Sequence, residues 1–188
     1  ILSVTRTLSE QDLNAALDAR GKQAAADYGK AASTPLKSDV DVAPFTALLQ
    51  KPAFQQATKV AQRLAQNDGL DISDVNQLFD TPKGLHYIKL ALDDQIGTAA
   101  QQGLGAAERR AIVGVKNDYL DWLDKASPSY QAARQNFAEA SGPINRMEAL
   151  QDITKRTQTA APDVEGNPIL SQAKWKNVVT NNLDELGK

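Results

Sequence analysis

Apolar and polar positions follow the period of an α-helix along most of this chain, and the clearest case begins at Thr81. Its hydroxyl group can cap a helix, and Pro82 suits the first helical position, where an amide hydrogen would have no partner. The apolar residues that follow recur at intervals of three and four, which is typical of one buried helix face: Leu85, Ile88, Leu92, Ile96 and Ala99. After a break at 101–105, a second helix with the same spacing ends near Ala126.

This pair of helices predicts the centre of the fold. A short connection favours antiparallel neighbours, so residues 82–126 predict an antiparallel helical hairpin. We expect seven side chains to form its seam: Leu85, Ile88, Leu92, Ile112, Val115, Tyr119 and Trp122.

More helices are predicted before the hairpin. Ser9 can cap a helix over about 10–32, which Ser33-Thr34-Pro35 ends. A short helix around Phe45 and a longer one from Pro52 follow, and the latter stops at Asn67-Asp68-Gly69, where glycine suits a left-handed position. A short helical turn is expected over 75–79.

Helices also follow the hairpin. Ser127-Pro128 repeats the pattern of a cap followed by proline. Ser141-Gly142-Pro143 is predicted to end that helix and to begin the next. Residues 157–168 have no apolar period and read as a linker, and a last helix with Trp175 follows Ser171.

The pattern therefore predicts an all-α chain, an irregular multi-helix bundle built around the central antiparallel hairpin. We expect an N-terminal helix over 1–34, a bundle domain over 35–157, a linker over 158–170 and a C-terminal helix over 171–188. The pattern leaves open whether the first helix packs or projects, and whether the last one begins further structure. Because the chain begins at Ile1 and its last helical pattern could continue, we expect a segment of a longer protein.

Composition narrows the function classes. The 188 residues include no cysteine, which excludes disulfides and cysteine-bound metals. Lysine and arginine total 21 against 23 acidic residues, and Arg109-Arg110 and Lys155-Arg156 form no basic stripe, so a dedicated nucleic-acid binder is disfavoured. No stretch approaches the ~20 apolar residues of a membrane span.

Few residues are candidates for chemistry. His86 is the one histidine, and it lies at the edge of the apolar face, where a half-exposed packing or capping role is favoured over catalysis. Asp93 and Asp94 diverge on a helix because they are adjacent. Asp118, Asp121 and Asp124 share a rough face that could hold a hard cation, although a solvated face is the commoner meaning.

Two further patterns resemble motifs without matching them. Glu139 lacks the flanking residues of a muramidase acid, and Gly103-Leu104-Gly105 is too short for a phosphate-binding loop. Aromatic residues gather in the central helices, where a core role is favoured over a partner-binding groove: Tyr87, Tyr119, Trp122, Tyr130 and Phe137.

Two stretches carry a resemblance. Residues 85–94 (LHYIKLALDD) with 119–134 (YLDWLDKASPSYQAAR), and the segment from Ala161 to Trp175 (ending GNPILSQAKW), resemble a helical region of large tailed-phage and prophage virion proteins. The resemblance covers about 85–180. It implies a structural role in the virion or the DNA-ejection apparatus, and it carries no catalytic residue over.

We therefore expect a non-catalytic structural or assembly segment of a phage or prophage virion protein, located in the virion or the bacterial cytoplasm. Its partners would be other protein chains, through self-association or with virion proteins, and no specific nucleic acid. No catalytic, cofactor-binding or metal-binding residue and no cofactor is assigned. The alternative is a helical protein-binding module of a cellular protein. An enzyme fragment would instead predict titratable groups converging near His86 or Asp118–Asp124.

Overall fold

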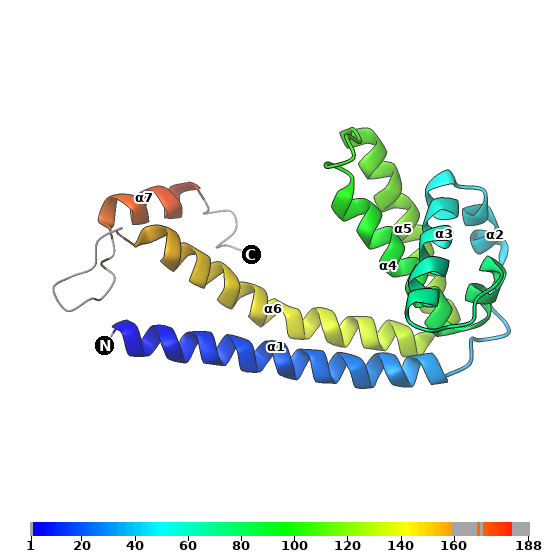
Figure 1. Cartoon of the computed structure of the whole chain (residues 1–188), viewed down its shortest axis with the longest axis horizontal. Helices are drawn as coiled ribbons and strands as arrows, with labels where there is room; N and C mark the ends of the chain where they lie inside the picture. The colour runs from blue at the N-terminus through cyan, green and yellow to red at the C-terminus, as the bar shows by residue number, and fades with distance from the viewer. Residues whose placement is uncertain (1, 159–168, 170, 182–188) are drawn as a thin grey trace. The chain divides into compact units, whose positions relative to one another are not determined.

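A computed structural model describes residues 2–158, 169 and 171–181, and the ordered elements in this part of the chain are all helices (Figure 1). This confirms the prediction of an all-α chain. The elements are α1 (Leu2–Ser33), α2 (Ala43–Leu49), α3 (Pro52–Asn67), the 3-10 helix η1 (Val75–Asp80), α4 (Pro82–Thr98), α5 (Ala106–Ala126), α6 (Pro128–Thr157) and α7 (Gln172–Asn181).

The chain divides into two compact units. One is Ala24–Gln135, here called the hairpin unit. The other combines the described residues of 1–23 and of 136–188 and is here called the terminal unit. Helices α1 and α6 each contribute residues to both units. Most of the predicted linker, 159–168 and 170, and the last residues, 182–188, lie outside the described residues.

The predicted hairpin is confirmed within the hairpin unit. The hydroxyl group of Tyr119 in α5 donates to the carbonyl of Leu85 near the start of α4, over 2.7 Å. Further along α4, Asp93 pairs with Lys116, which precedes Tyr119 in α5, so the two helices run antiparallel. Gly103 turns the connection at a φ of 74°. All seven predicted seam residues are buried.

Helices α2 and α3 complete the core of this unit. Phe54 of α3 is fully buried, and its ring packs on Tyr119 at 5.2 Å between centroids. Phe45 of α2 packs on Trp122 at 4.3 Å. The indole N–H of Trp122 also donates to the carbonyl of Asp41, which attaches the loop before α2 to α5. Aromatic contacts thus join the consecutive helices α2 and α3 to α5, which lies far from them in the sequence.

The predicted helix ends and caps are mostly confirmed. Gly69 has a φ of 80°, and the amide of Leu70 behind it donates to the carbonyl of Ala65, as in a glycine-terminated helix. The hydroxyl oxygen of Thr81 accepts from the amide of Gly84 at the start of α4. The predicted turn over 75–79 is η1, and Asp74 caps it with a reciprocal bond from Gln77.

Two predicted helix boundaries are wrong. Helix α1 already begins at Leu2, so Ser9 lies inside it and is not its cap; the residues from Leu2 to Leu8 include no proline or glycine to stop the helix. Helix α6 continues through Pro143. The missing amide of a proline and its ring cost about 3 kcal/mol inside a helix. The apolar period nevertheless continues past Pro143, with Ile144 and Ile153 buried, and this burial offsets that cost.

The terminal unit has a smaller apolar core. Leu13, Ile144 and Ile153 are buried in it. The guanidinium group of Arg20 lies 5.0 Å from the centre of the Phe137 ring and donates to the hydroxyl oxygen of Ser141. Phe137 is 39% exposed, so its predicted role in the core is wrong; its ring instead supports a cation–π contact with Arg20.

No helix among the described residues combines the length and the apolar character that crossing a bilayer requires.

One glycine permits a close approach of two elements in the hairpin unit. A Cβ atom at Gly84 would lie 2.2 Å from the carbonyl oxygen of Leu78 in η1 and 2.7 Å from its Cα. These are backbone atoms of a fully buried residue, so they cannot move aside without displacing η1. The glycine therefore allows η1 to pack directly on the first turn of α4.

We predict that Gly84→Ala lowers the free energy of unfolding by at least about 2 kcal/mol, although alanine favours helix. Gly97→Ala in the same helix is the matched control. Nothing lies within 4 Å of a Cβ atom at Gly97, so this variant should raise the free energy of unfolding by up to about 1 kcal/mol. Urea denaturation followed by circular dichroism measures both, and equal effects of the two variants would contradict the close packing.

Candidate functional site

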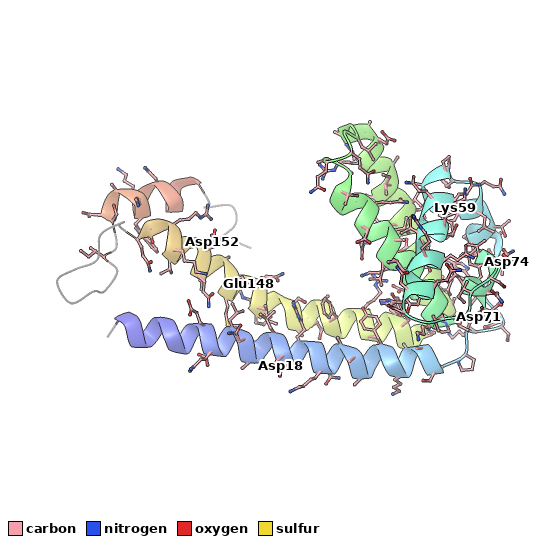
Figure 2. All side chains as sticks on the ribbon, in the orientation of Figure 1. Asp18, Lys59, Asp71, Asp74, Glu148 and Asp152 are labelled. Atoms are coloured by element: carbon pink, nitrogen blue, oxygen red, sulfur yellow. The ribbon has the colours of Figure 1, made fainter. Side chains whose placement is uncertain are left out.

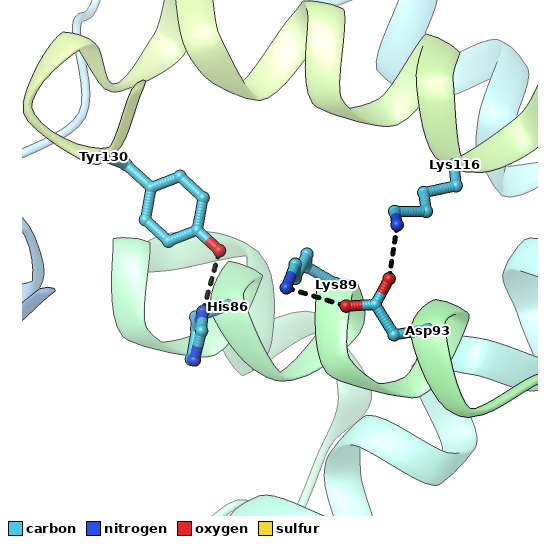
Figure 3. Close-up of polar contacts among 5 residues, drawn as sticks. All are labelled: His86, Lys89, Asp93, Lys116 and Tyr130. Atoms are coloured by element: carbon cyan, nitrogen blue, oxygen red, sulfur yellow. Dashed lines mark hydrogen bonds and ion pairs between the residues drawn. The ribbon is translucent and has the colours of Figure 1, made fainter. Parts of the chain in front are cut away.

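Polar side chains meet along one face of α4 in the hairpin unit. His86, Lys89 and Asp93 share this face because they are spaced by three and four residues. Figure 3 shows His86 facing Tyr130 of α6, and Asp93 lying between Lys89 and Lys116 of α5. Three helices therefore contribute polar groups to this cluster.

His86 belongs to an aromatic group. Its Nδ1 atom lies 2.7 Å from the hydroxyl oxygen of Tyr130, which is 1% exposed. The ring of Tyr28 from α1 lies 5.1 Å from the imidazole and 5.4 Å from the Tyr130 ring. The predicted role of His86 as a half-exposed packing residue agrees with these contacts and with its intermediate exposure.

This environment sets the protonation of the group. Burial, with a smaller effect from the positive charge of Lys89, lowers the pKa of His86 to about 4, although the carboxylate of Asp93 acts in the opposite direction. Burial also raises the pKa of Tyr130 far above its ordinary value. Near neutral pH both groups are uncharged. A histidine with this pKa is a weak base, and a tyrosine with this pKa is a poor nucleophile, so the pair is suited to holding α4 against α6.

Asp93 is held as a carboxylate by its two lysines. Burial raises the pKa of Asp93, but hydrogen bonds from Lys116 and Lys89 outweigh this effect, and the pKa is lower than usual. The two nitrogen–oxygen distances are 2.5 Å to Lys116 and 2.7 Å to Lys89. The lysine of α5 makes this pair a link between the hairpin helices. Asp94, its neighbour in sequence, points away and is exposed.

The three aspartates of α5 do not form one group. Asp118 and Asp121 line a groove of about 390 Å³ beside Trp122, together with Lys51 and Lys125. Asp124 instead pairs with Arg134 of α6 at 2.6 Å. Lysine and arginine thus neutralise this face. Within the described part of the chain, no three metal-ligating side chains come close enough to hold an ion.

The other candidate residues have structural positions. Glu139 is exposed on α6. Gly103 and Gly105 form the turn between α4 and α5, and Gly105 is the residue before the first turn of α5. Arg109 and Arg110 are exposed on α5.

Ion pairs within single helices occupy the surface of the terminal unit. Figure 2 shows Asp18 on α1, and Glu148 and Asp152 on α6. Asp18 pairs with Lys22, and Asp152 pairs with Arg156 one turn later. Exposed pairs of this kind contribute only a few tenths of a kcal/mol each.

The aromatic prediction is confirmed for four of its five residues, since Tyr87, Tyr119, Trp122 and Tyr130 are buried. Tyr87 donates to a carboxylate oxygen of Asp68 over 2.7 Å, and burial together with this bond raises its pKa to about 12. The meeting of His86 with Tyr28 was not predicted, because the two are 58 positions apart and no local pattern connects them.

Comparisons with known protein families, with curated proteins and with solved structures found no match.

We predict that His86 makes stability depend on pH between about 6.5 and 4. The unfolded state binds a proton in this window and the folded state does not, because the folded pKa is the lower one. The contribution of the neutral His86 to the free energy of unfolding is therefore fully present above pH 6.5. It falls as the pH approaches 4, by at most about 3 kcal/mol. Urea denaturation at pH 7 and pH 4.5 measures this loss.

His86→Leu should remove that part of the loss. Asp93→Asn is the control. The pKa of Asp93 is already lower than 3.8, so its contribution is lost only at more acidic pH, and the variant should keep the histidine-dependent decline. If His86→Leu loses as much stability as the unchanged protein between these pH values, the burial of a neutral His86 is wrong.

Proposed function

We propose that this chain is a non-catalytic structural segment of a tailed-phage or prophage virion protein, and that it assembles with other protein chains in the virion or its DNA-ejection apparatus. The observation that carries the assembly role is the set of exposed apolar side chains in the terminal unit, here called its apolar surface. The virion setting rests on the resemblance of residues 85–180 to helical regions of such proteins.

Apolar exposure is concentrated in the terminal unit. Among the described residues, six large apolar side chains are exposed, and four of them belong to this unit: Phe137, Leu150, Ile169 and Trp175. Leu150 is 56% exposed and Trp175 48%. Scattered apolar residues are common on monomers, but tryptophan and phenylalanine are enriched where proteins bind one another. We therefore assign this surface to contacts with another chain.

The charges of the terminal unit support a protein partner. Its α6 pairs Arg156 with Asp152, and α1 pairs Lys22 with Asp18. The positive charges in these pairs are already neutralised by aspartates, whereas binding to a nucleic acid would need them for its phosphate groups. A surface with paired charges and exposed apolar groups is suited to the rim and centre of a protein interface.

A helical protein-binding module of a cellular protein is the alternative. It would use the same apolar side chains, so the surface does not separate the two functions. Their locations differ, because only a virion component would be part of the particle.

We predict that the segment self-associates through this surface. Leu150→Gln combined with Trp175→Gln should weaken the association at least tenfold, because interface aromatic residues commonly contribute more than 1.4 kcal/mol. Val42→Thr combined with Val113→Thr changes exposed apolar residues of the hairpin unit and is the matched control. Size-exclusion chromatography with light scattering over a concentration series measures the equilibrium. An unchanged protein that stays monomeric, or equal effects of the two double variants, would contradict this use of the surface.

We also predict that the protein is a constant component of particles released by its host. Mass spectrometry of particles purified through a density gradient should detect it at a fixed ratio to the other virion proteins. Detection only in the cell extract of the producing culture would reject the virion role and leave the cellular binding module.

A further inference from the structure

A second cavity lies in the hairpin unit, on the other side of Asp118 from the groove beside Trp122. Its volume is about 490 Å³, within the range of small-molecule sites. The start of α3 contributes Pro52 and Ala53, and α5 contributes Ile112 and Val115. These residues form an apolar lining. Leu104, from the turn between α4 and α5, adds to it.

One polar group in this lining is incompletely bonded. Gln95 of α4 is 9% exposed, and its carbonyl oxygen Oε1 is the one buried side-chain polar atom without a partner in the described part of the chain. Its amide nitrogen donates to the carbonyl of Ala53 over 3.3 Å, which is long for such a bond. A buried acceptor without a donor is destabilising, so its presence calls for a reason.

The carboxamide can present this oxygen to the cavity. The last torsion of a glutamine side chain has a broad, shallow preference, so turning the group is easy. The only bond that resists the turn is the long one to Ala53. An N–H or O–H group of a molecule in the cavity could then donate to Oε1 of Gln95, which has no hydrogen-bond donor in this structure.

The cavity also owes part of its space to a glycine. Gly114, in the interior of α5, lines it, and a Cβ atom there would meet nothing within 4 Å. Glycine in a helix interior is less stable than alanine, and here no close approach of another element requires it. A larger side chain at Gly114 would therefore fill part of the cavity.

The charged side chains of the cavity do not favour an ion. Lys51, Glu108 and Asp118 line it, and all three are exposed, so the charges have both signs and keep contact with water. Gln95 is the enclosed polar group of this lining, since Gln56 and Gln102 also line the cavity but are exposed. An uncharged molecule fits this combination best.

We propose that this cavity is a binding site for a small, uncharged, largely apolar molecule that carries an N–H or O–H donor, which bonds to Oε1 of Gln95. The site is separate from the apolar surface of the terminal unit, so it stands independently of the proposed function. A ligand that also carries a carbonyl group would complete a two-bond pair with the carboxamide, and a simple aromatic amide has both features.

Benzamide is the probe, and toluene is the probe without a donor. Titration of the ¹⁵N-labelled protein with each, followed by ¹H–¹⁵N correlation spectra, reports binding at the amide of Gly114 and at the side-chain amide of Gln95. We expect saturable shifts at both with benzamide and binding about tenfold weaker with toluene. Gln95→Leu should remove this difference between the probes while leaving the protein folded, because it deletes an unpaired polar atom.

Gly114→Leu should abolish binding of both probes by occupying the space. Gly97→Leu is its matched control, since Gly97 also lies inside a helix with open space around it but does not line the cavity. Equal binding of benzamide and toluene, or the same titration for Gly114→Leu and Gly97→Leu, would overturn the proposal. So would the lack of saturation by benzamide in a protein whose spectrum shows that it is folded.

Discussion

The burial of Tyr119 fixes the register on which the rest of the hairpin unit depends. Its side chain is fully enclosed, and its hydroxyl group donates to the carbonyl of Leu85 over 2.7 Å. A phenol buried without a partner would cost at least 1–3 kcal/mol, so this bond is a condition of the packing. Burial raises the pKa of Tyr119 well above its ordinary value, and the donor stays neutral. Helix α5 can therefore lie on α4 in one register only.

This register places Lys116 of α5 opposite Asp93 of α4. Helix α6 adds the contact of Tyr130 with His86. The start of α3 covers Gln95 of α4, whose carbonyl oxygen is left without a donor. In the terminal unit fewer apolar side chains are buried, and Phe137, Leu150, Ile169 and Trp175 are exposed. One unit is thus organised by internal packing, and the other leaves more of its large apolar side chains exposed.

Sequence reasoning predicted what local rules govern. Thr81-Pro82, Gly69 and the seven seam residues followed from capping, left-handed backbone and helical spacing. Ser9 was misleading because no proline or glycine between Leu2 and Leu8 stops the helix before it. Pro143 was misleading because Ile144 and Ile153 beyond it are buried, which favours continuing the helix. The contact of Gly84 with η1 and the incomplete bonding of Gln95 depend on residues distant in the sequence, so no spacing could reveal them.

The central claim is that Ala24–Gln135 is stabilised by its own core, whereas the terminal unit, for which we propose a partner chain, is less stable alone. Amide hydrogen exchange of the isolated protein tests this directly, because it measures local opening helix by helix. The account predicts that the slowest amides lie in α3, α4 and α5, and that α7 and the part of α6 after Asn136 exchange faster by at least about a hundredfold. Equal protection of the two units, or slower exchange in the terminal unit, would contradict it.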